Sequence, residues 1–203
     1  MYKGYIEVNQ NDDKYVKLYN DISFNTFDCF TNQYVLVKDD EGNLVDRLKW
    51  DGEKYDHLSY KQIKNTYTGK VKPLNPQQEL AFDMLQDKET TVKVLTGRFG
   101  SGKTFLMISM ALQLISDGKF DKLIWVRNNQ EVKDTKALGA LPGEALDKLL
   151  PFAMPIADHV GGIDGLELLV KQNKLEIEHL GWIRGRSFSN AIIMCSEAEN
   201  LTK

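Results

Sequence analysis

The stretch Gly97-Arg98-Phe99-Gly100-Ser101-Gly102-Lys103-Thr104 fits the pattern G-x-x-x-x-G-K-[ST], and the expected fold follows from it. The run before it, residues 92–95, has the composition of a short strand. Residues 104–116 have that of an apolar helix closed by Gly118. Strand, loop and helix are the context that the pattern requires. The sequence therefore predicts a loop that holds the phosphates of a nucleoside triphosphate.

Each residue type in this loop has a chemical task. Its glycines permit backbone angles and a close approach that a Cβ would block, so amide N–H groups turn toward phosphate oxygens. Lys103 reaches the β- and γ-phosphates, and the Thr104 hydroxyl ligates Mg²⁺. Phe105 stands where a dinucleotide-binding loop needs its third glycine, which excludes that alternative. The predicted ATP contacts are Gly97, Arg98, Phe99, Gly100, Ser101, Gly102, Lys103, Thr104 and Phe105.

Composition narrows the function classes. The chain has 203 residues and a formal net charge of -3, so no overall positive field attracts nucleic acid or an anionic membrane. Cys29 and Cys195 show neither a disulfide framework nor zinc-ligand spacing. No apolar run reaches membrane-spanning length, and the start lacks the apolar segment of a signal sequence. We expect a cytoplasmic protein without a membrane partner.

We expect two domains, at residues 1–70 and 71–203. The first is a small β-rich domain, in which residues 33–38 and 43–50 are predicted to form a hairpin. Asp12 or Asp13 is expected to cap a short helix that follows it. Pro73 and Pro76 mark the break between the domains and precede the predicted helix at residues 77–85.

The second domain is expected to be an α/β fold of the P-loop NTPase, RecA-like kind. A strand, a helix and a further strand in sequence favour a parallel sheet flanked by helices, with a right-handed crossover. Because Lys203 follows the last predicted strand closely, a truncated sheet is one expectation. The remaining predicted helices are 143–150 and 166–170, and the remaining strands are 123–126, 175–178 and 191–195.

The last of these strands is the candidate partner of the phosphate loop. In a P-loop enzyme an acidic residue at the end of such a strand holds Mg²⁺, and a Glu after it often polarises the attacking water. Here Ser196 fills the magnesium position and Glu197 follows, so Lys103 and Glu197 are the candidate catalytic residues. A serine hydroxyl is neutral, so it holds a magnesium-bound water without offering the ion a charge.

With these residues identified, the chain resembles the PhoH family of P-loop ATPases, related to superfamily 1 helicases, and especially the ATPase half of PIN–PhoH fusions. The resemblance spans nearly all of the second domain and is weaker in the first, at residues 32–36 and 48–52. The stretches that carry it are residues 74–82 (LNPQQELAF), the phosphate loop, 138–143 (LGALPG), 183–187 (IRGRS) and 197–202 (EAENLT).

The resemblance implies further roles. Gln78 matches the helicase-type Q motif, whose side-chain amide both donates to and accepts from the adenine edge. The family has Asp-Glu-Ala-Gln where this chain has Ser-Glu-Ala-Glu at residues 196–199, so nucleotide binding is expected and hydrolysis is the open question. The family's later motifs are absent, which indicates either a fragment or a reduced relative. A ring-shaped homo-oligomer is also implied.

Three arginines are candidates for contacts with phosphates of RNA or of ATP. Arg127 follows the strand at 123–126, and Arg184 and Arg186 flank Gly185. A guanidinium binds phosphate oxygens through paired hydrogen bonds, and surface ion pairs with carboxylates are the alternative role for these arginines. Trp125 is expected to pack in the core rather than to stack on bases.

Two functions remain open at this point. The first is an ATPase motor module acting on RNA, with Lys103 on the γ-phosphate, Thr104 and Ser196 around Mg²⁺, and Glu197 on water. The second is a regulatory or scaffold module that binds ATP or ADP with little or no hydrolysis, as Ser196 and the early chain end suggest.

Overall fold

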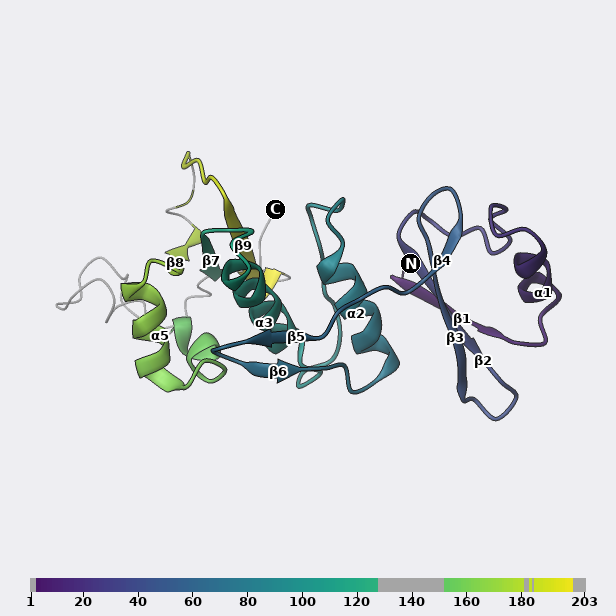
Figure 1. Ribbon diagram of the computed structural model, residues 1–203, viewed down its shortest axis with the longest axis horizontal. Helices are drawn as coiled ribbons and strands as arrows, with labels where there is room; N and C mark the ends of the chain where they lie inside the picture. Colours follow the sequence, from purple (N-terminus) through teal and green to yellow (C-terminus); the bar gives the residue numbers. More distant parts are fainter. Residues whose placement is uncertain (1–2, 128–151, 181–182, 184, 199–203) are drawn as a thin grey trace, which may run out of the picture. The chain divides into compact units, whose positions relative to one another are not determined.

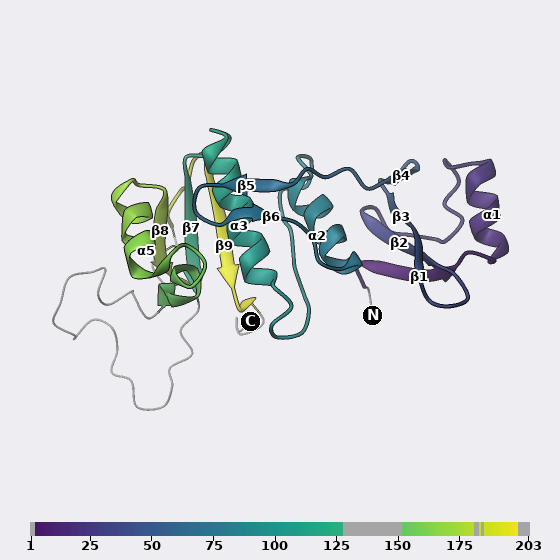
Figure 2. The ribbon, with the colours of Figure 1, turned by 60° about the horizontal axis from the view of Figure 1, so that its bottom comes forward.

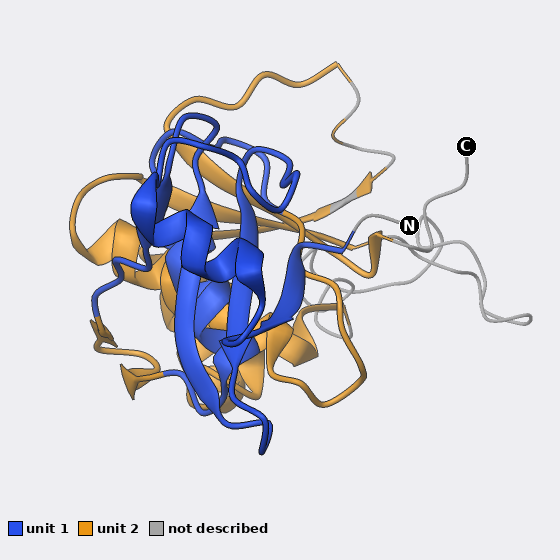
Figure 3. Ribbon diagram, turned by 90° about the vertical axis from the view of Figure 1, so that its right-hand side faces the viewer, with its two compact units in different colours: residues 1–61, 73–93 blue, residues 62–72, 94–203 orange. Residues whose placement is uncertain are grey.

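The computed structural model describes residues 3–127, 152–180, 183 and 185–198, whose elements are labelled in Figure 1. The chain divides into two compact units that interleave along the sequence (Figure 3). Unit 1 comprises Met1–Lys61 and Pro73–Lys93, and unit 2 comprises Gln62–Lys72 and Val94–Lys203. A single boundary at residue 70 would fall inside the first segment of unit 2, so the units do not simply follow one another.

Unit 1 is built on a sheet whose described strands are ordered β1 (Tyr5–Asn9), β2 (Gln33–Lys38), β3 (Leu44–Trp50) and β4 (Tyr55–His57). β1 pairs with β2 in parallel, and the other neighbours pair antiparallel. The predicted hairpin is therefore confirmed as β2 and β3. Asp39 closes its turn, because its carboxylate accepts a hydrogen bond of 2.7 Å from the backbone N–H of Asn43.

Helix α1 (Asp13–Asn20) covers one face of this sheet. Asp12 is its N-cap, and the Asp12 carboxylate accepts a hydrogen bond of 2.8 Å from the backbone N–H of Lys14. The expected cap is thus confirmed. Leu18 of α1 is fully buried in one hydrophobic cluster with Val35 of β2, which fixes the helix against the sheet.

Helix α2 (Pro76–Gln86), the helix predicted after the two prolines, covers the other face. Its Leu80 lies in a second buried cluster with Leu36 of β2. Leu36 directly follows Val35, and because adjacent strand residues point to opposite faces of a sheet, α2 and α1 pack on opposite faces. The hydroxyl of Tyr34 also donates a buried hydrogen bond of 2.8 Å to the carboxylate of Asp83 on α2. Strand β2 is therefore buried between two helices.

Unit 2 contains the parallel sheet. Its described strands lie in the order β8 (Leu175–His179), β7 (Lys122–Arg127), β9 (Ala191–Ser196), and both pairings are parallel (Figure 2). These are three of the strands predicted from the sequence. Trp125 of the central strand is fully buried, and its indole N–H donates to the carbonyl oxygen of Phe152 at 3.0 Å. The expected core position of this tryptophan is confirmed.

Helices α3 (Lys103–Ser116) and α5 (Gly162–Lys171) pack on this sheet and confirm two more predicted helices. The predicted helix at 143–150 lies outside the described residues. Within the described ranges, no helix has both the length and the apolar character needed to cross a membrane. The core of unit 2 consists of Ile108, Ala111, Leu112, Ile115, Leu123, Trp125, Ala153, Ile156, Ala157, Val160, Leu166, Leu169, Leu175, Ile177 and Met194.

A hairpin of β5 (Ile63–Asn65) and β6 (Gly69–Val71) belongs to unit 2 and fastens α3. The buried side-chain amide of Asn65 donates to the carbonyl oxygen of Ser109, in the middle of α3, at 3.1 Å. At the hairpin turn, Tyr67 packs against the core of unit 2. Local sequence patterns did not predict this hairpin. Its contacts with α3 and with the core explain why it belongs to unit 2.

The prediction of a strand at residues 92–95 is wrong. These residues are irregular, and the side chains of Val92 and Val94 are 78% and 71% exposed. The ammonium of Lys93 donates to the carbonyl oxygen of Leu85 at 3.0 Å and to that of Asp87, at the end of α2. An alternating apolar pattern forms a strand only beside a partner, and none of the described strands pairs with this segment.

Candidate nucleotide-binding site

The candidate site centres on Gly97–Thr104, which leads into α3 in unit 2. Gly100 and Gly102 have φ angles of 74° and 83°, in the left-handed region. Such a conformation costs other residues roughly 1–2 kcal/mol, whereas glycine adopts it freely. A Cβ on Gly97 would also come within 3.2 Å of the Ser101 hydroxyl. The glycine spacing therefore corresponds to a backbone that glycine forms without strain.

Lys103 lies folded over this loop. Its ammonium donates hydrogen bonds to the carbonyl oxygens of Gly97 at 2.8 Å and Arg98 at 3.0 Å. Both acceptors are neutral, whereas a phosphate carries negative charge and attracts the ammonium more strongly. A phosphate group that enters the loop would therefore draw Lys103 away from these carbonyls at little cost.

The start of α3 adds positive potential to the loop. Its N-cap is Gly102, which makes no side-chain capping bond, and the first turn contains no acidic residue. The N–H groups of a first turn lack partners within the helix and carry the positive end of its dipole. Loop, lysine and helix start therefore form a setting suited to an anion, as expected for a phosphate group.

The side chains of the other predicted nucleotide contacts differ in exposure and packing. The side chain of Phe99 is 99% exposed, so it has no packing role in unit 2. Arg98 is exposed as well, whereas Thr104 in the first turn of α3 is half-buried. Phe105 is turned to a protein neighbour, since its ring centroid lies 5.2 Å from that of His159.

Ser196 and Glu197 lie at the carboxyl end of β9. Ser196 is 9% exposed and is the register partner of Arg127, the last residue of β7. Glu197 follows with a φ of 55°, a left-handed conformation that is uncommon for glutamate. The guanidinium of Arg127 pairs with the Glu197 carboxylate at 3.0 Å. Sequence reasoning missed this pair because its members lie 70 positions apart.

These strand ends lie toward the same end of unit 2 as the start of α3. A short turn joins the end of α3 at Ser116 to the start of β7 at Lys122, so helix and strand run in opposite directions (Figure 2). The first turn of α3 therefore lies toward the end where β7 and β9 finish. In open α/β sheets, ligands bind at the carboxyl ends of the strands. The predicted loop, Ser196 and Glu197 thus belong to one edge.

The residues at this edge fit Mg²⁺ only together with a nucleotide. Among the described residues, no group of three or more His, Cys, Asp or Glu side chains could hold a metal ion. Thr104 and Ser196 offer neutral hydroxyls, and Mg²⁺ commonly takes its remaining ligands from substrate phosphates and water. Burial raises the pKa of the neighbouring Cys195 thiol.

Gln78 lies in the first turn of α2, in unit 1. Its backbone N–H donates to the Asn75 carboxamide at 2.9 Å, and its side-chain oxygen accepts from the backbone N–H of Leu74 at 2.8 Å. This reciprocal pattern resembles a capping box, so part of its hydrogen-bonding capacity serves the helix start. The loop belongs to unit 2, and the adenine contact of Gln78 stays a prediction.

The described arginines of the phosphate-contact prediction are ion-paired. Arg127 binds Glu197, as above, and Arg186 binds both Glu176, at 2.6 Å, and Glu178. Arg186 also lies over the ring of Phe188, 4.8 Å from its centroid. Arg184 lies outside the described residues. A phosphate would have to compete with carboxylates for either described arginine.

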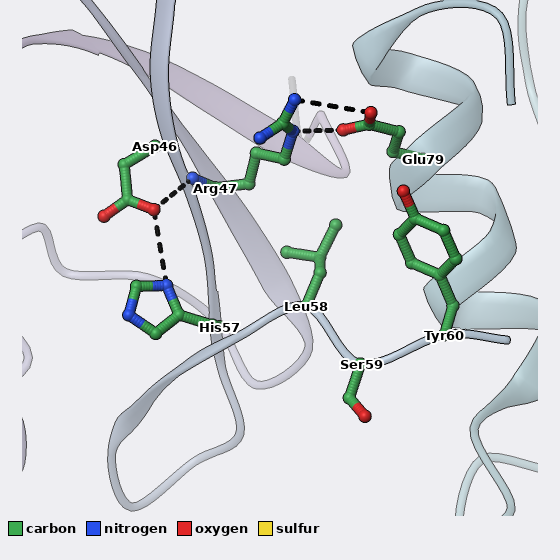
Figure 4. A pocket seen from close by; sticks show the side chains of 7 residues that line it. All are labelled: Asp46, Arg47, His57, Leu58, Ser59, Tyr60 and Glu79. Atoms are coloured by element: carbon green, nitrogen blue, oxygen red, sulfur yellow. Dashed lines mark hydrogen bonds and ion pairs between the residues drawn. The ribbon is translucent and has the colours of Figure 1, made fainter.

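A separate pocket of about 470 Å³ lies in unit 1 (Figure 4). Its charged groups already bind one another: Arg47 pairs with Glu79, and the carboxylate of Asp46 lies 3.3 Å from the imidazole of His57. The hydroxyl of Tyr19 also donates to Asp46 at 2.6 Å. Because these cationic groups are already paired with carboxylates, they offer little positive charge to an anionic ligand. The pocket is therefore not the candidate nucleotide site.

A parallel sheet packed on a helix that begins at a G-x-x-x-x-G-K-[ST] loop is the arrangement of P-loop nucleotide-binding proteins. This is the class of protein that the fold and the site indicate. The comparisons with known proteins then identify the group within the class. The model of the PhoH-like protein family matches residues 70–203, and the chain belongs to the PhoH family.

Curated relatives agree with this family. Protein PhoH2 of Bacillus subtilis (strain 168) is 29% identical over 220 residues, which take in 100% of this chain and 48% of the relative. The PhoH-like protein of Synechocystis sp. is 34% identical over 109 residues, covering 52% and 33%. Protein PhoH of Escherichia coli (strain K12) is 30% identical over 112 residues, covering 53% and 31%. The chain thus spans less than half the length of these relatives.

Proposed function

We propose that this chain binds ATP with Mg²⁺ at Gly97–Thr104 and works as an ATPase together with RNA. The observation that carries the nucleotide assignment is the loop itself: left-handed glycines, a lysine folded over it and an uncapped helix start. The family supports a nucleotide-binding protein of the ATPase type. The RNA component rests on the family resemblance and on the arginine at the edge of the sheet.

In this proposal, each residue has a stated role. The loop amides and Lys103 bind the β- and γ-phosphates, and Thr104 and Ser196 hold Mg²⁺ and its water. When bound, Mg²⁺ neutralises charge on the phosphate oxygens. Glu197 orients the attacking water and accepts its proton. The adenine contact of Gln78 stays a prediction of the family resemblance.

A second candidate function is nucleotide binding with little or no hydrolysis. Two observations favour it: Ser196 gives Mg²⁺ no negative ligand, and Glu197 is engaged by Arg127. A neutral ligand raises the barrier of the chemical step more than it weakens ground-state binding, which the loop mainly supplies. The chain would then respond to ATP or ADP by occupancy, as a regulatory or scaffold module.

The experiment that separates these functions measures nucleotide binding and phosphate release on the same samples, with and without single-stranded RNA. Lys103→Ala is the test variant, and Lys171→Ala, on the exposed surface of α5, is the matched control. RNA-stimulated phosphate release that Lys103→Ala abolishes and Lys171→Ala retains supports the ATPase. Tight ATP binding without release, in either condition, supports the second function. Failure of the parent chain to bind ATP or ADP overturns both.

A further inference from the structure

Arg127 and Glu197 form an ion pair, although the proposed function gives each of them a different role. Glu197 is the candidate residue for activating water, and Arg127 is a candidate for phosphate contact. Their atoms Nη2 and Oε1 lie 3.0 Å apart. While Arg127 Nη2 donates to Glu197 Oε1, this donor is not offered to a phosphate and this oxygen is not offered to water. The two tasks therefore compete.

Backbone geometry gives a second, independent reason to regard the paired arrangement as one of two. Glu197 has a φ of 55°, and a left-handed conformation costs a residue other than glycine free energy that its surroundings must offset. Such positions cluster at sites whose arrangement changes with a ligand.

The pair is also accessible to a competing anion. The side chain of Arg127 is 26% exposed and that of Glu197 is 48% exposed, so a phosphate can approach from solvent. Backbone pairing of β7 with β9 fixes Arg127 beside Ser196, whatever its side chain binds. Phosphate oxygens accept two parallel hydrogen bonds from a guanidinium, and the Glu197 carboxylate accepts from Arg127 Nη2.

We propose that Arg127 is a phosphate-sensitive positioning residue for Glu197: a phosphoryl group that binds Arg127 releases the glutamate carboxylate from it. The ligand chemistry is a phosphoryl oxygen, which either an RNA backbone or the γ-phosphate of a nucleotide can supply. RNA would then activate the site by removing the Arg127 contact from the Glu197 carboxylate. This inference deepens the proposed function, on which its catalytic consequence rests.

A binding cycle tests the competition without requiring hydrolysis. The variants are Arg127→Gln, Glu197→Gln and the double variant. Glu167→Gln, at an exposed ion pair with Lys171 on α5, is the matched control. The affinities of each protein are measured for a single-stranded RNA oligonucleotide, for non-hydrolysable ATP and for ADP. Thermal unfolding of each variant checks that it is folded.

If Glu197 competes with phosphate, its neutralisation should tighten binding by about two- to five-fold, the range of exposed ion pairs. The gain should disappear in the Arg127→Gln background and be absent in Glu167→Gln. Tightening for RNA identifies the RNA backbone as the source. Tightening for the ATP analogue but not for ADP identifies the γ-phosphate. No change for any of the three ligands overturns the proposal.

Phosphate release gives the second readout where the parent chain turns over. Arg127→Gln should raise release without RNA toward the RNA-stimulated rate and remove the stimulation, while Glu197→Gln lowers release in both conditions. If Arg127→Gln instead lowers the rate of phosphate release equally with and without RNA, Arg127 holds Glu197 in its working position. That result would overturn the proposal that a phosphoryl group separates Glu197 from Arg127. Loss of ATP binding in Lys103→Ala concerns the proposed function alone, because the RNA affinities of the cycle do not depend on it.

Discussion

The ammonium of Lys103 donates a hydrogen bond to the carbonyl oxygen of Gly97, six residues earlier, at 2.8 Å. The lysine thus closes its own loop and lies where phosphate oxygens are expected. Lys103→Ala should weaken ATP binding about 10- to 100-fold, since a hydrogen bond to a charged group contributes roughly 1.5–3 kcal/mol. Isothermal titration calorimetry measures this. Lys171→Ala should bind like the parent; an equal loss in both variants would contradict the assignment.

Ser196 supplies the second prediction. Ser196→Asp places a charged oxygen ligand at the carboxyl end of β9, beside Arg127 in the register of the sheet. Release of phosphate from ATP should rise about tenfold or more, which corresponds to roughly 1.4 kcal/mol in the barrier. Ser196→Asn is the control, because it has the same shape without the charge. Equal rates of the two variants would show that charge at this position does not limit turnover.

The buried hydrogen bond of Tyr34 to Asp83 predicts a stability effect in unit 1. Asp83 is 8% exposed, and its other oxygen accepts from the backbone N–H of Ser59 at 2.8 Å. Tyr34→Phe should lower the free energy of unfolding by about 1–3 kcal/mol, because it leaves a buried acceptor without its donor. Urea denaturation measures the change.

Tyr67→Phe is the control for this prediction. It removes the same hydroxyl from an exposed hydrogen bond with Gln172 and should change the free energy of unfolding by less than about 0.5 kcal/mol. Similar decreases in the free energy of unfolding for the two variants would show that burial does not determine the effect of removing the hydroxyl.

Glu176 predicts a pH dependence of stability. A hydrogen bond from Lys122, and another from Arg186, lower the pKa of Glu176 from 4.5 to about 2, although burial opposes this. The folded pKa lies below the ordinary value, so ionised Glu176 stabilises the fold fully above about pH 4.5. That stabilisation is lost as the pH falls toward 2.

The measurement is the free energy of unfolding of the parent and of Glu176→Gln between about pH 6 and pH 2. We expect the parent to be more stable at the upper end and the difference to shrink as the pH falls through this window. Glu167→Gln, in an exposed pair on α5, should differ little from the parent throughout. A difference for Glu176→Gln that grows toward low pH would contradict the sign.

Local patterns predicted most of the elements. The hairpin of β2 and β3, the Asp12 cap, helices α2, α3 and α5, and strands β7, β8 and β9 agree with the structure. Each combines an apolar run or a periodic apolar pattern with a capping or turn residue nearby, so neighbouring residues suffice to define it. The helix predicted at 143–150 lies outside the described residues.

Tertiary contacts decided the elements that local patterns missed or misassigned. The segment 92–95 has the composition of a strand, yet Lys93 is bound to the end of α2 and no described strand lies beside it. The hairpin of β5 and β6 precedes α2 in sequence but is fastened to α3 through Asn65. Both outcomes depend on partners far along the chain, which short windows do not contain.

By itself, the sequence determined the phosphate loop and the family, because glycine, lysine and threonine stand at fixed spacing within one short segment. Only the tertiary structure decided what surrounds that segment. Parallel pairing of β7 with β9 brings Arg127 to Ser196 and Glu197 across 70 positions of sequence. Ion pairing depends on distances of a few ångströms in space, and these exist only once the sheet has formed.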